Sequence, residues 1–100
     1  MVKGGTVYIL ANKTNSVLYT DVTSNLSKRV LEHKTNKYPD SFSTKYNCSK
    51  LVFYKNFLHH IDESIAFEKK IKKGSRNKKI DLINEINYEW KDLWDLVQEW

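Results

Sequence analysis

The sequence predicts a compact α/β domain in which short strands and amphipathic helices share one small core. Three segments are rich in β-branched and aromatic residues, as strands are, and other segments repeat apolar residues at helical spacing. The chain has 100 residues, of which 40% are hydrophobic and 13% aromatic, enough for a small core without disulfides. Since we find no linker, repeat or low-complexity segment, we expect a single domain over residues 1–100.

The first two strands form a predicted β-hairpin. Strand-forming residues fill Thr6–Ala11 and Val17–Val22, and a polar stretch typical of a turn separates them. Side chains alternate between the two faces of a strand, so Asp21 shares a face with Tyr19. By the same alternation, Tyr8 shares a face of the first strand with Thr6 and Leu10.

A helix follows the hairpin, and Thr23 or Ser24 can cap it. Its inward positions recur at helical spacing: Leu26, Val30 and His33. Arg29 lies one turn from both ends of this stripe. We therefore expect Arg29 and His33 to flank one apolar face of the helix.

The segment from Lys34 to Asn47 is polar and contains the chain's single proline, so we predict a surface loop. Cations and aromatic residues alternate in it: Lys37, Tyr38, Phe42, Lys45 and Tyr46. This mixture suits nucleic-acid binding, in which cations meet phosphates and rings stack on bases. It suits equally a loop whose rings anchor it to the domain, and the sequence leaves both interpretations open.

Leu51–Phe57 is the third predicted strand, and its apolar composition favours a central strand or one covered on both faces. His59 and His60 follow it. Adjacent histidines point in different directions from an extended chain, and no third ligand stands at a suitable spacing. We expect a pair of loop histidines there, without zinc.

The next helix begins near Asp62, and its apolar positions are Ile61, Ile65, Ala66 and Ile71. Glu68 falls beside this buried stripe. A carboxylate in such a place needs a cationic partner or a metal ion, because burying an unpaired charge is costly. A salt bridge to a neighbouring lysine and a metal-binding role are the two interpretations.

Lys69–Lys79 is the most basic part of the chain, with seven cations in eleven residues. Gly74 and Ser75 stand in its middle, where one helix ends and the next is capped. The net charge of the chain is +5, but residues 1–80 carry +10 and residues 81–100 carry −5. A solvated helix face and a phosphate-binding surface both explain such a run.

Ile80 and Ile83 supply the core side of the following helix. Residues 88–100 are predicted to form a C-terminal packing helix that lies as a lid over the edge of the sheet, with four inward positions: Trp90, Leu93, Trp94 and Val97. If several of these tryptophans are exposed, the helix is better explained as a protein-interaction surface.

No apolar run approaches the length of a membrane span, and the N-terminus lacks the apolar core of a signal peptide. The lone Cys48 cannot form an internal disulfide, and it is interpreted as a small packing residue. We therefore expect a cytoplasmic protein that does not interact with membranes.

Five pieces of the chain, in this order, resemble a known family. They read V-Y-I, then L-Y-T-D-V-T running into N-L-x-K-R-V-x-E-H, then F-S-T-K-Y-N, A-F-E-K-K-I-K-K and N-Y-E-W-K-D-L. Their order and spacing are similar to those of the GIY-YIG nuclease domain. The resemblance is to its small single-domain bacterial branch (UPF0213-like), related to the N-terminal nuclease domain of the excinuclease C subunit.

The resemblance implies a small, mainly antiparallel three-stranded sheet flanked by helices. It also implies a DNA endonuclease that hydrolyses phosphodiester bonds with Mg²⁺ or Mn²⁺ and acts in DNA repair or on branched or damaged DNA. RNA remains a second candidate substrate, and the oligomeric state is left open. Since a domain of this size has no appended recognition module, we expect weak sequence specificity.

The resemblance also assigns roles to individual residues. Glu68 matches the metal-binding glutamate, Arg29 would stabilise the phosphate, and His33 would serve in a water relay or bind phosphate. Tyr8 and Tyr19 match the two motif tyrosines, one of which acts as general base. Beside this catalytic set we expect seven cations to contact nucleic acid: Lys45, Lys69, Lys72, Lys73, Arg76, Lys78 and Lys79.

One departure bears directly on activity, because Asp21 stands where the family motif has glycine. A carboxylate on the face that carries Tyr19 adds bulk and repels a phosphate. Three functions follow as hypotheses. The first is an active nuclease, in which Asp21 is tolerated or serves as a second metal ligand. The others are a nucleic-acid-binding domain impaired in cleavage by Asp21, and a protein-interaction module that uses the Trp-rich C-terminus.

Overall fold

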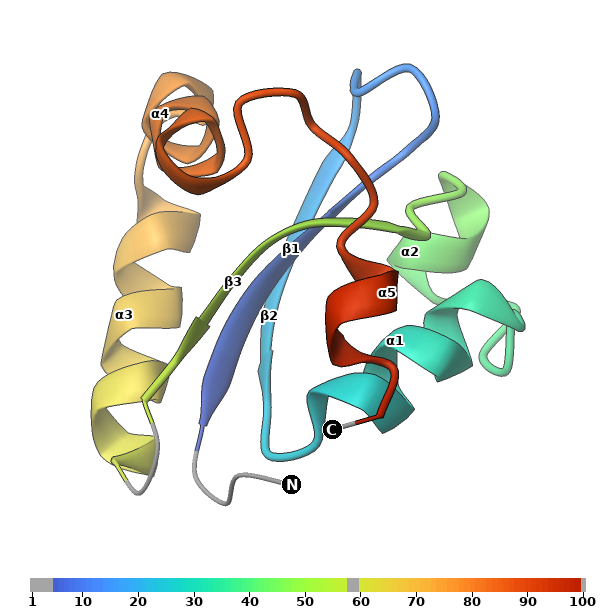
Figure 1. Ribbon diagram of the computed structural model, residues 1–100, viewed down its shortest axis with the longest axis horizontal. Helices are drawn as coiled ribbons and strands as arrows, with labels where there is room; N and C mark the ends of the chain where they lie inside the picture. Colours follow the sequence, from blue (N-terminus) through green and yellow to red (C-terminus); the bar gives the residue numbers. More distant parts are fainter. Residues whose placement is uncertain (1–4, 58–59, 100) are drawn as a thin grey trace.

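A computed structural model describes residues 5–57 and 60–99, and this part of the chain contains three strands and five helices (Figure 1). The elements in chain order are β1 (Thr6–Ala11), β2 (Leu18–Thr23), α1 (Leu26–Lys34), α2 (Phe42–Lys45), β3 (Lys50–Asn56), α3 (Ile61–Lys73), α4 (Arg76–Ile86) and α5 (Trp94–Val97). The three strands form one antiparallel sheet flanked by helices, which confirms the predicted fold class.

The sheet has the order β2-β1-β3, so β1 is the central strand. Every residue of β1 is buried, because helices cover both of its faces and a strand lies on each side of it. The pairing places Tyr8 opposite Asp21 of β2 and opposite Tyr54 of β3. The β1–β2 pair is the predicted hairpin, and its register fixes which side chains meet above the sheet.

Strand β3 pairs only with β1 in the described part of the chain, so it is not the central strand. Of the two alternatives that its composition left open, the structure shows cover on both faces, since Leu51 is buried in one core and Val52 and Phe53 in the other. The C-terminal segment takes the place of a further strand. The backbone N–H of Leu93 donates to the carbonyl of Leu51 at 2.8 Å, and the Leu51 N–H donates to Asp92 Oδ1 at 3.1 Å. The predicted lid over the sheet's edge therefore exists, and it shields an edge that would otherwise be open to pairing.

Asn87, just after α4, is the strongest single link in this lid. Its side-chain Nδ2 donates to the carbonyl of Val52 at 3.1 Å and to that of Lys91 at 2.8 Å, and its Oδ1 accepts from the Lys91 N–H at 3.1 Å. The residue is buried, so water does not compete for these contacts.

We predict that Asn87→Ala lowers the free energy of unfolding by about 2 kcal/mol, because a buried carbonyl loses its donor. Asn77→Ala, at an exposed position of α4, is the matched control and should change stability by less than about 0.5 kcal/mol. Urea denaturation of both variants measures the difference. Equal effects of the two substitutions would show that the lid contributes nothing specific.

The C-terminal helix is shorter than predicted. The structure gives α5 only four residues in place of the helix expected over 88–100, of which Trp100 lies outside the described residues. Trp90 adopts φ 56°, a left-handed conformation that interrupts a helix, and the contacts of Asp92 and Leu93 go to β3. Trp90 and Trp94 are partly buried and pack on the two cores, so the condition set for a tryptophan-rich interaction surface is not met by these two residues.

Three local expectations also change. The predicted loop at 34–47 contains the one-turn helix α2, capped by the Ser41 side chain. Asn25, rather than Thr23 or Ser24, caps α1 through its side chain, and His60 precedes α3 where Asp62 was expected. His59 lies outside the described residues. By contrast, Ser75 caps α4 as predicted.

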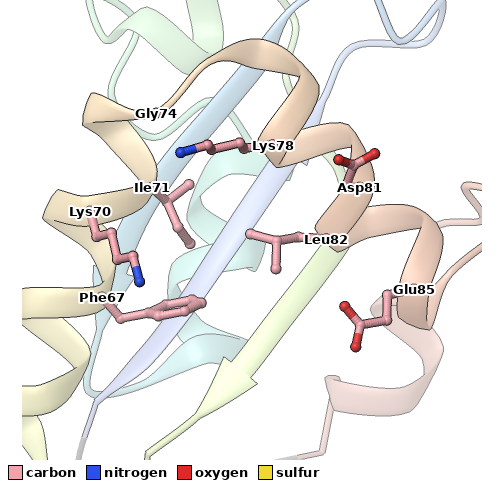
Figure 2. Close-up of a pocket in the computed structure, with 8 residues that line it drawn as sticks. All are labelled: Phe67, Lys70, Ile71, Gly74, Lys78, Asp81, Leu82 and Glu85. Atoms are coloured by element: carbon pink, nitrogen blue, oxygen red, sulfur yellow. The ribbon is translucent and has the colours of Figure 1, made fainter.

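The sheet separates two cores. On one face, α1, α2 and α5 pack over Tyr8, Leu10 and Leu51, and on the other α3 and α4 pack over Ile9 and Phe53 (Figure 1). A groove of about 300 Å³ lies between α3 and α4, with an apolar floor and charged residues at its rim (Figure 2). No helix in the described part of the chain is long and apolar enough to cross a membrane.

Candidate active site

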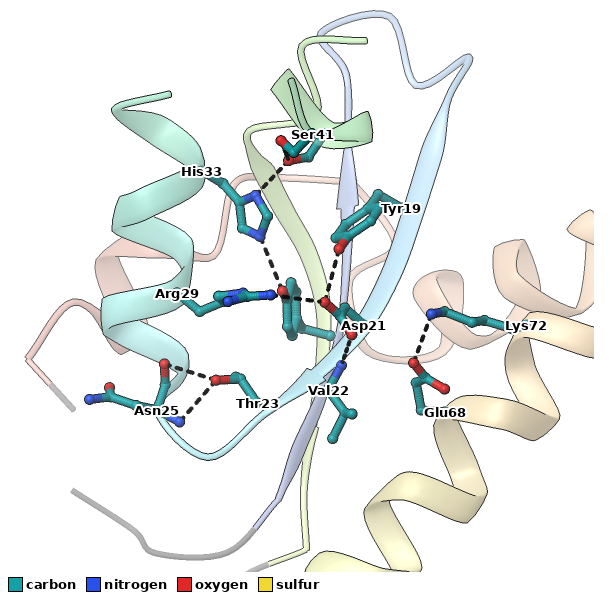
Figure 3. A network of polar contacts seen from close by, with 12 residues as sticks. Tyr19, Asp21, Val22, Thr23, Asn25, Arg29, His33, Ser41, Glu68 and Lys72 are labelled. Carbon is teal, nitrogen blue, oxygen red and sulfur yellow. Dashed lines mark hydrogen bonds and ion pairs between the residues drawn. The ribbon is translucent and has the colours of Figure 1, made fainter. Parts of the chain in front are cut away.

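Four of the five predicted catalytic residues meet on the sheet face covered by α1 and α2. Tyr8 comes from the central strand. Tyr19 comes from the edge strand β2, and Arg29 and His33 come from one side of α1 (Figure 3). The ring centroids of the two tyrosines are 6.5 Å apart, and the His33 ring lies 6.0 Å from Tyr8 and 5.5 Å from Tyr19. Strand alternation and the i, i+4 spacing in α1 produce this convergence, as the sequence predicted.

His33 is held at both ring nitrogens. Its Nε2 lies 3.1 Å from the Tyr8 hydroxyl oxygen, and its Nδ1 lies 2.6 Å from Ser43 Oγ of α2. Burial, followed by the positive charge of Arg29, holds the pKa of His33 below its ordinary value. The imidazole is therefore neutral at pH 7, with one nitrogen donating and the other accepting. Ser43 was missed by the sequence analysis, because a serine in a polar segment carries no signal of its buried contact.

The neutral state of His33 makes stability depend on pH. The unfolded chain has a histidine pKa near 6.5 and the folded chain a lower one, so between these values the unfolded state binds more protons. Stability is therefore complete above about pH 6.5 and falls as the pH drops through this window, with a slope of at most about 1.4 kcal/mol per pH unit. Denaturation of wild type, His33→Gln and the control His60→Gln from pH 7.5 to 5 tests this. An unchanged slope in His33→Gln would contradict it.

Tyr8 is fully enclosed, with no exposed surface. Burial, and then the negative charge of Asp21, raises the pKa of its phenol well above the ordinary value. Tyr8 is thus a neutral hydrogen-bonding partner of His33 and has no direct access to water. Of the two motif tyrosines, Tyr19 is the one with partial exposure.

Asp21 is the centre of the polar contacts at β2. Its Oδ2 accepts a hydrogen bond from the Tyr19 hydroxyl at 2.9 Å and forms an ion pair with Arg29 Nη2 at 3.4 Å, and its Oδ1 accepts from the Val22 N–H at 2.8 Å (Figure 3). Burial, followed by the hydrogen bond to Asp21 and its charge, raises the pKa of Tyr19 to about 12. The aspartate thus holds the Tyr19 hydroxyl in a hydrogen bond, adds to the effect of burial on its pKa, and pairs with Nη2 of Arg29.

One donor of the Arg29 guanidinium lacks a hydrogen-bond partner in the described part of the chain. Its Nε is buried and has no hydrogen-bond partner among the described residues. A buried donor without a partner is unfavourable, and a phosphate oxygen would satisfy it, because the guanidinium fork matches phosphate geometry. The orphaned Nε therefore supports Arg29 as a phosphate-binding residue.

Glu68 lies on α3, which packs against β1 and β2 from the other side of the sheet, and its carboxylate does not join the contacts around Asp21 (Figure 3). It is 7% exposed, and its Oε2 pairs with Lys72 Nζ at 2.8 Å. The salt bridge that the sequence left open is thus present. The buried position expected for the carboxylate is confirmed as well.

A magnesium ion suits Glu68 through the chemistry of its donor. Mg²⁺ prefers oxygen ligands and commonly takes one or two carboxylates, with water and substrate phosphate completing its coordination. Within residues 5–57 and 60–99, no group of three or more His, Cys, Asp or Glu side chains could hold a metal by itself. Glu68 fits as the protein ligand, provided that the half-exposed Lys72 moves aside.

The cations predicted to contact nucleic acid lie on three helices, α2, α3 and α4. Lys69, Lys72 and Lys73 are exposed on α3, and Lys45 is exposed at the end of α2. At the start of α4, Arg76 donates to the carbonyl of Asn15, and Lys78 and Lys79 follow it. Lys72 connects this basic surface to Glu68. The groove of Figure 2 lies on the side of the sheet away from Tyr8 and His33.

Comparison with known proteins agrees with this arrangement. A family described as "GIY-YIG catalytic domain" matches residues 4–81. A UPF0213 protein of Clostridium perfringens (strain 13 / Type A) is 39% identical over 88 residues, which cover 83% of this chain and 91% of the relative. One from Syntrophus aciditrophicus (strain SB) is 34% identical over 79 residues, covering 79% and 88%.

A solved structure is similar as well. The solution NMR structure of a UPF0213 protein from Bacillus halodurans has a TM-score of 0.53 and 28% sequence identity to this chain, covering 86% of this chain and 90% of that one. The family match gives the GIY-YIG domain, and the two relatives and the solved structure are UPF0213 proteins, so the resemblance predicted from five sequence pieces is confirmed.

Proposed function

Because the chain belongs to the GIY-YIG catalytic domain family, a family of nuclease-type hydrolases, we propose that it hydrolyses phosphodiester bonds in DNA with Mg²⁺ or Mn²⁺. The observation that carries the proposal is the convergence of Tyr19, Arg29 and His33 at the edge strand β2, with a buried carboxylate on the helix packed behind it. The substrate preference proposed is for DNA structure rather than sequence, with branched or damaged DNA as candidates.

Each residue has a distinct task in this proposal. Arg29, whose side chain is 38% exposed, binds the scissile phosphate with its guanidinium and stabilises the added charge of the transition state. Glu68 holds the metal ion, which when bound would offset phosphate charge and lower the pKa of a water ligand. Tyr19, the partly exposed tyrosine, orients the attacking water, and the neutral pair of His33 and Tyr8 supports it from inside the domain.

Asp21 restrains this site. It competes with the phosphate for Arg29, and it holds the Tyr19 hydroxyl in a hydrogen bond. A carboxylate beside the expected phosphate position also repels the substrate, and this repulsion is stronger in a partly buried site than in water. We therefore propose a slow nuclease, whose bound phosphate must displace the carboxylate from Arg29.

The same contacts favour a second candidate function. If phosphate never displaces Asp21, the chain binds nucleic acid through its basic surface without cutting it. Binding of that kind weakens steeply as salt rises, because cations released from the phosphates drive it. An interaction through the C-terminal segment, the third hypothesis, would respond little to salt.

The test is incubation of supercoiled plasmid, single-stranded, duplex and branched oligonucleotides with the full chain, in Mg²⁺, Mn²⁺ or EDTA. Cleavage that needs the divalent ion supports the proposed nuclease. Salt-dependent binding without cleavage by wild type and by Asp21→Gly selects the binding function. Absence of both binding and cleavage at low salt, with DNA and with RNA, would overturn both nucleic-acid functions. Cutting confined to one short sequence would contradict the weak specificity.

A further inference from the structure

Helix α2 presents two aromatic rings to solvent beside the candidate active site. Phe42 is 48% exposed and Tyr46 is 42% exposed, and their ring centroids lie 4.6 Å apart across one turn. Phe42 also stacks on Tyr19, with centroids 5.9 Å apart and ring planes inclined by 24°. A continuous row of rings thus runs from the proposed water-orienting tyrosine out to the surface.

These rings are held in place rather than carried on a free loop. Ser43, between them in sequence, is buried and lies 2.6 Å from His33 Nδ1, and Ser41 caps the helix through its side chain. The attachment of α2 therefore does not depend on burying Phe42 and Tyr46. Because about half of each side chain stays in water, the folded chain gains less hydrophobic stabilisation from these rings than full burial would give. Exposed apolar rings of this kind are typical of a binding surface.

The charge around the row suits an anionic ligand. Lys45 is exposed, and its Nζ lies 5.8 Å from the Tyr46 ring centroid. Flat rings with a cation at their side match a nucleotide, whose base offers a π-face and whose phosphates carry negative charge.

We propose that Phe42 and Tyr46 form a stacking platform for an unpaired nucleobase next to the scissile phosphate, and that Lys45 meets the adjoining phosphate. In a duplex, neighbouring bases cover both faces of each base, so only single-stranded DNA or an unpaired end offers a free face. The site thus selects single-stranded DNA over duplex DNA. This inference rests on the proposed nucleic-acid function and names its substrate class.

The first test measures binding with the full chain carrying Glu68→Gln, so that cleavage does not interfere. Fluorescence anisotropy of a labelled oligothymidine and of a duplex of equal length gives the two affinities. Phe42→Ala and Tyr46→Ala should each weaken single-strand binding by about tenfold, within the range that one stacked ring contributes. Duplex binding, which depends on the cations, should change less than twofold.

Two further variants separate stacking from other effects. Phe42→Leu keeps an apolar contact with Tyr19 and should weaken binding nearly as much as Phe42→Ala. Tyr88→Ala removes a ring that is 82% exposed between α4 and α5, and should leave both affinities unchanged. Full binding by Phe42→Leu and Tyr46→Ala, or an equal loss in Tyr88→Ala, would overturn the inference.

An abasic oligonucleotide tests the platform without relying on the fold of any variant. Abasic spacers in place of the bases should weaken binding to the Glu68→Gln protein about tenfold. When Phe42→Ala is also present, the abasic spacers should weaken binding little further, because both changes remove the same stack. Equal affinity for the abasic and normal strands would overturn the platform while the proposed nuclease stands. If no oligonucleotide binds at low salt, the proposed function itself fails along with it.

Discussion

Replacing Asp21 with glycine should raise the rate of DNA cleavage by on the order of 10²-fold, the lower end of what one preorganised donor contributes to a transition state. The substitution frees Arg29 Nη2 and the Tyr19 hydroxyl together, because one carboxylate oxygen accepts from both. It also removes a negative charge from the place where the phosphate must approach. Single-turnover cleavage of a labelled oligonucleotide in saturating Mg²⁺ measures the effect.

Two variants control this experiment. Asp21→Asn keeps the size of the side chain and removes its charge, so it should give an intermediate rate. Asp40→Asn removes an exposed acid from the segment before α2 and should leave the rate within twofold of wild type. A folded Asp21→Gly protein that cuts no faster than wild type would show that the aspartate is not a restraint.

Glu68→Gln should lower metal-dependent cleavage by at least about 10²-fold, in wild type and in the faster Asp21→Gly background. The amide has nearly the same shape but no charge, so it is a poor ligand for Mg²⁺. The change also breaks the ion pair with Lys72. Because Lys72 is half exposed and its ammonium stays hydrated, we expect a loss of stability below about 1 kcal/mol.

The matched control is Glu63→Gln, an exposed acid in the first turn of the same helix. It should leave both the rate and its Mg²⁺ dependence unchanged. Titration of the rate with Mg²⁺ in all three proteins separates a lost metal ligand from a general loss of activity. Cleavage by Glu68→Gln at the wild-type rate and Mg²⁺ dependence would remove Glu68 from the site.

Local pattern predicted the hairpin and the two main helices well, because β-branched alternation and the i, i+4 spacing act over short distances. The position of β3 did not follow from its composition. Its apolar residues are buried by the two cores on its faces, and the segment from Asn87 to Leu93 covers its outer edge. No local pattern distinguishes that cover from a further strand. The same contacts shorten α5, since Asp92 and Leu93 bond to β3 instead of extending a helix.

The sequence predicted which residues of the candidate site share a face, but it did not predict all of their contacts. Strand alternation placed Asp21 on the face of Tyr19, and helical spacing placed Arg29 near His33. The shared contact of Asp21 with both Tyr19 and Arg29 depends on the packing of α1 against the sheet, which a one-dimensional pattern does not contain. The buried Ser43 beside His33 was out of reach for the same reason.

Asp21 holds the Tyr19 hydroxyl and Arg29 together in a closed arrangement, and the pKa of the Tyr19 phenol tests this central claim most directly. NMR titration of the protein labelled with ¹³Cζ-tyrosine, assigned through Tyr19→Phe, reports that pKa in wild type and in Asp21→Gly. The account predicts a wild-type pKa of about 12 and a lower one in Asp21→Gly, because two of the causes that raise it disappear. The same pKa in both proteins would contradict the account.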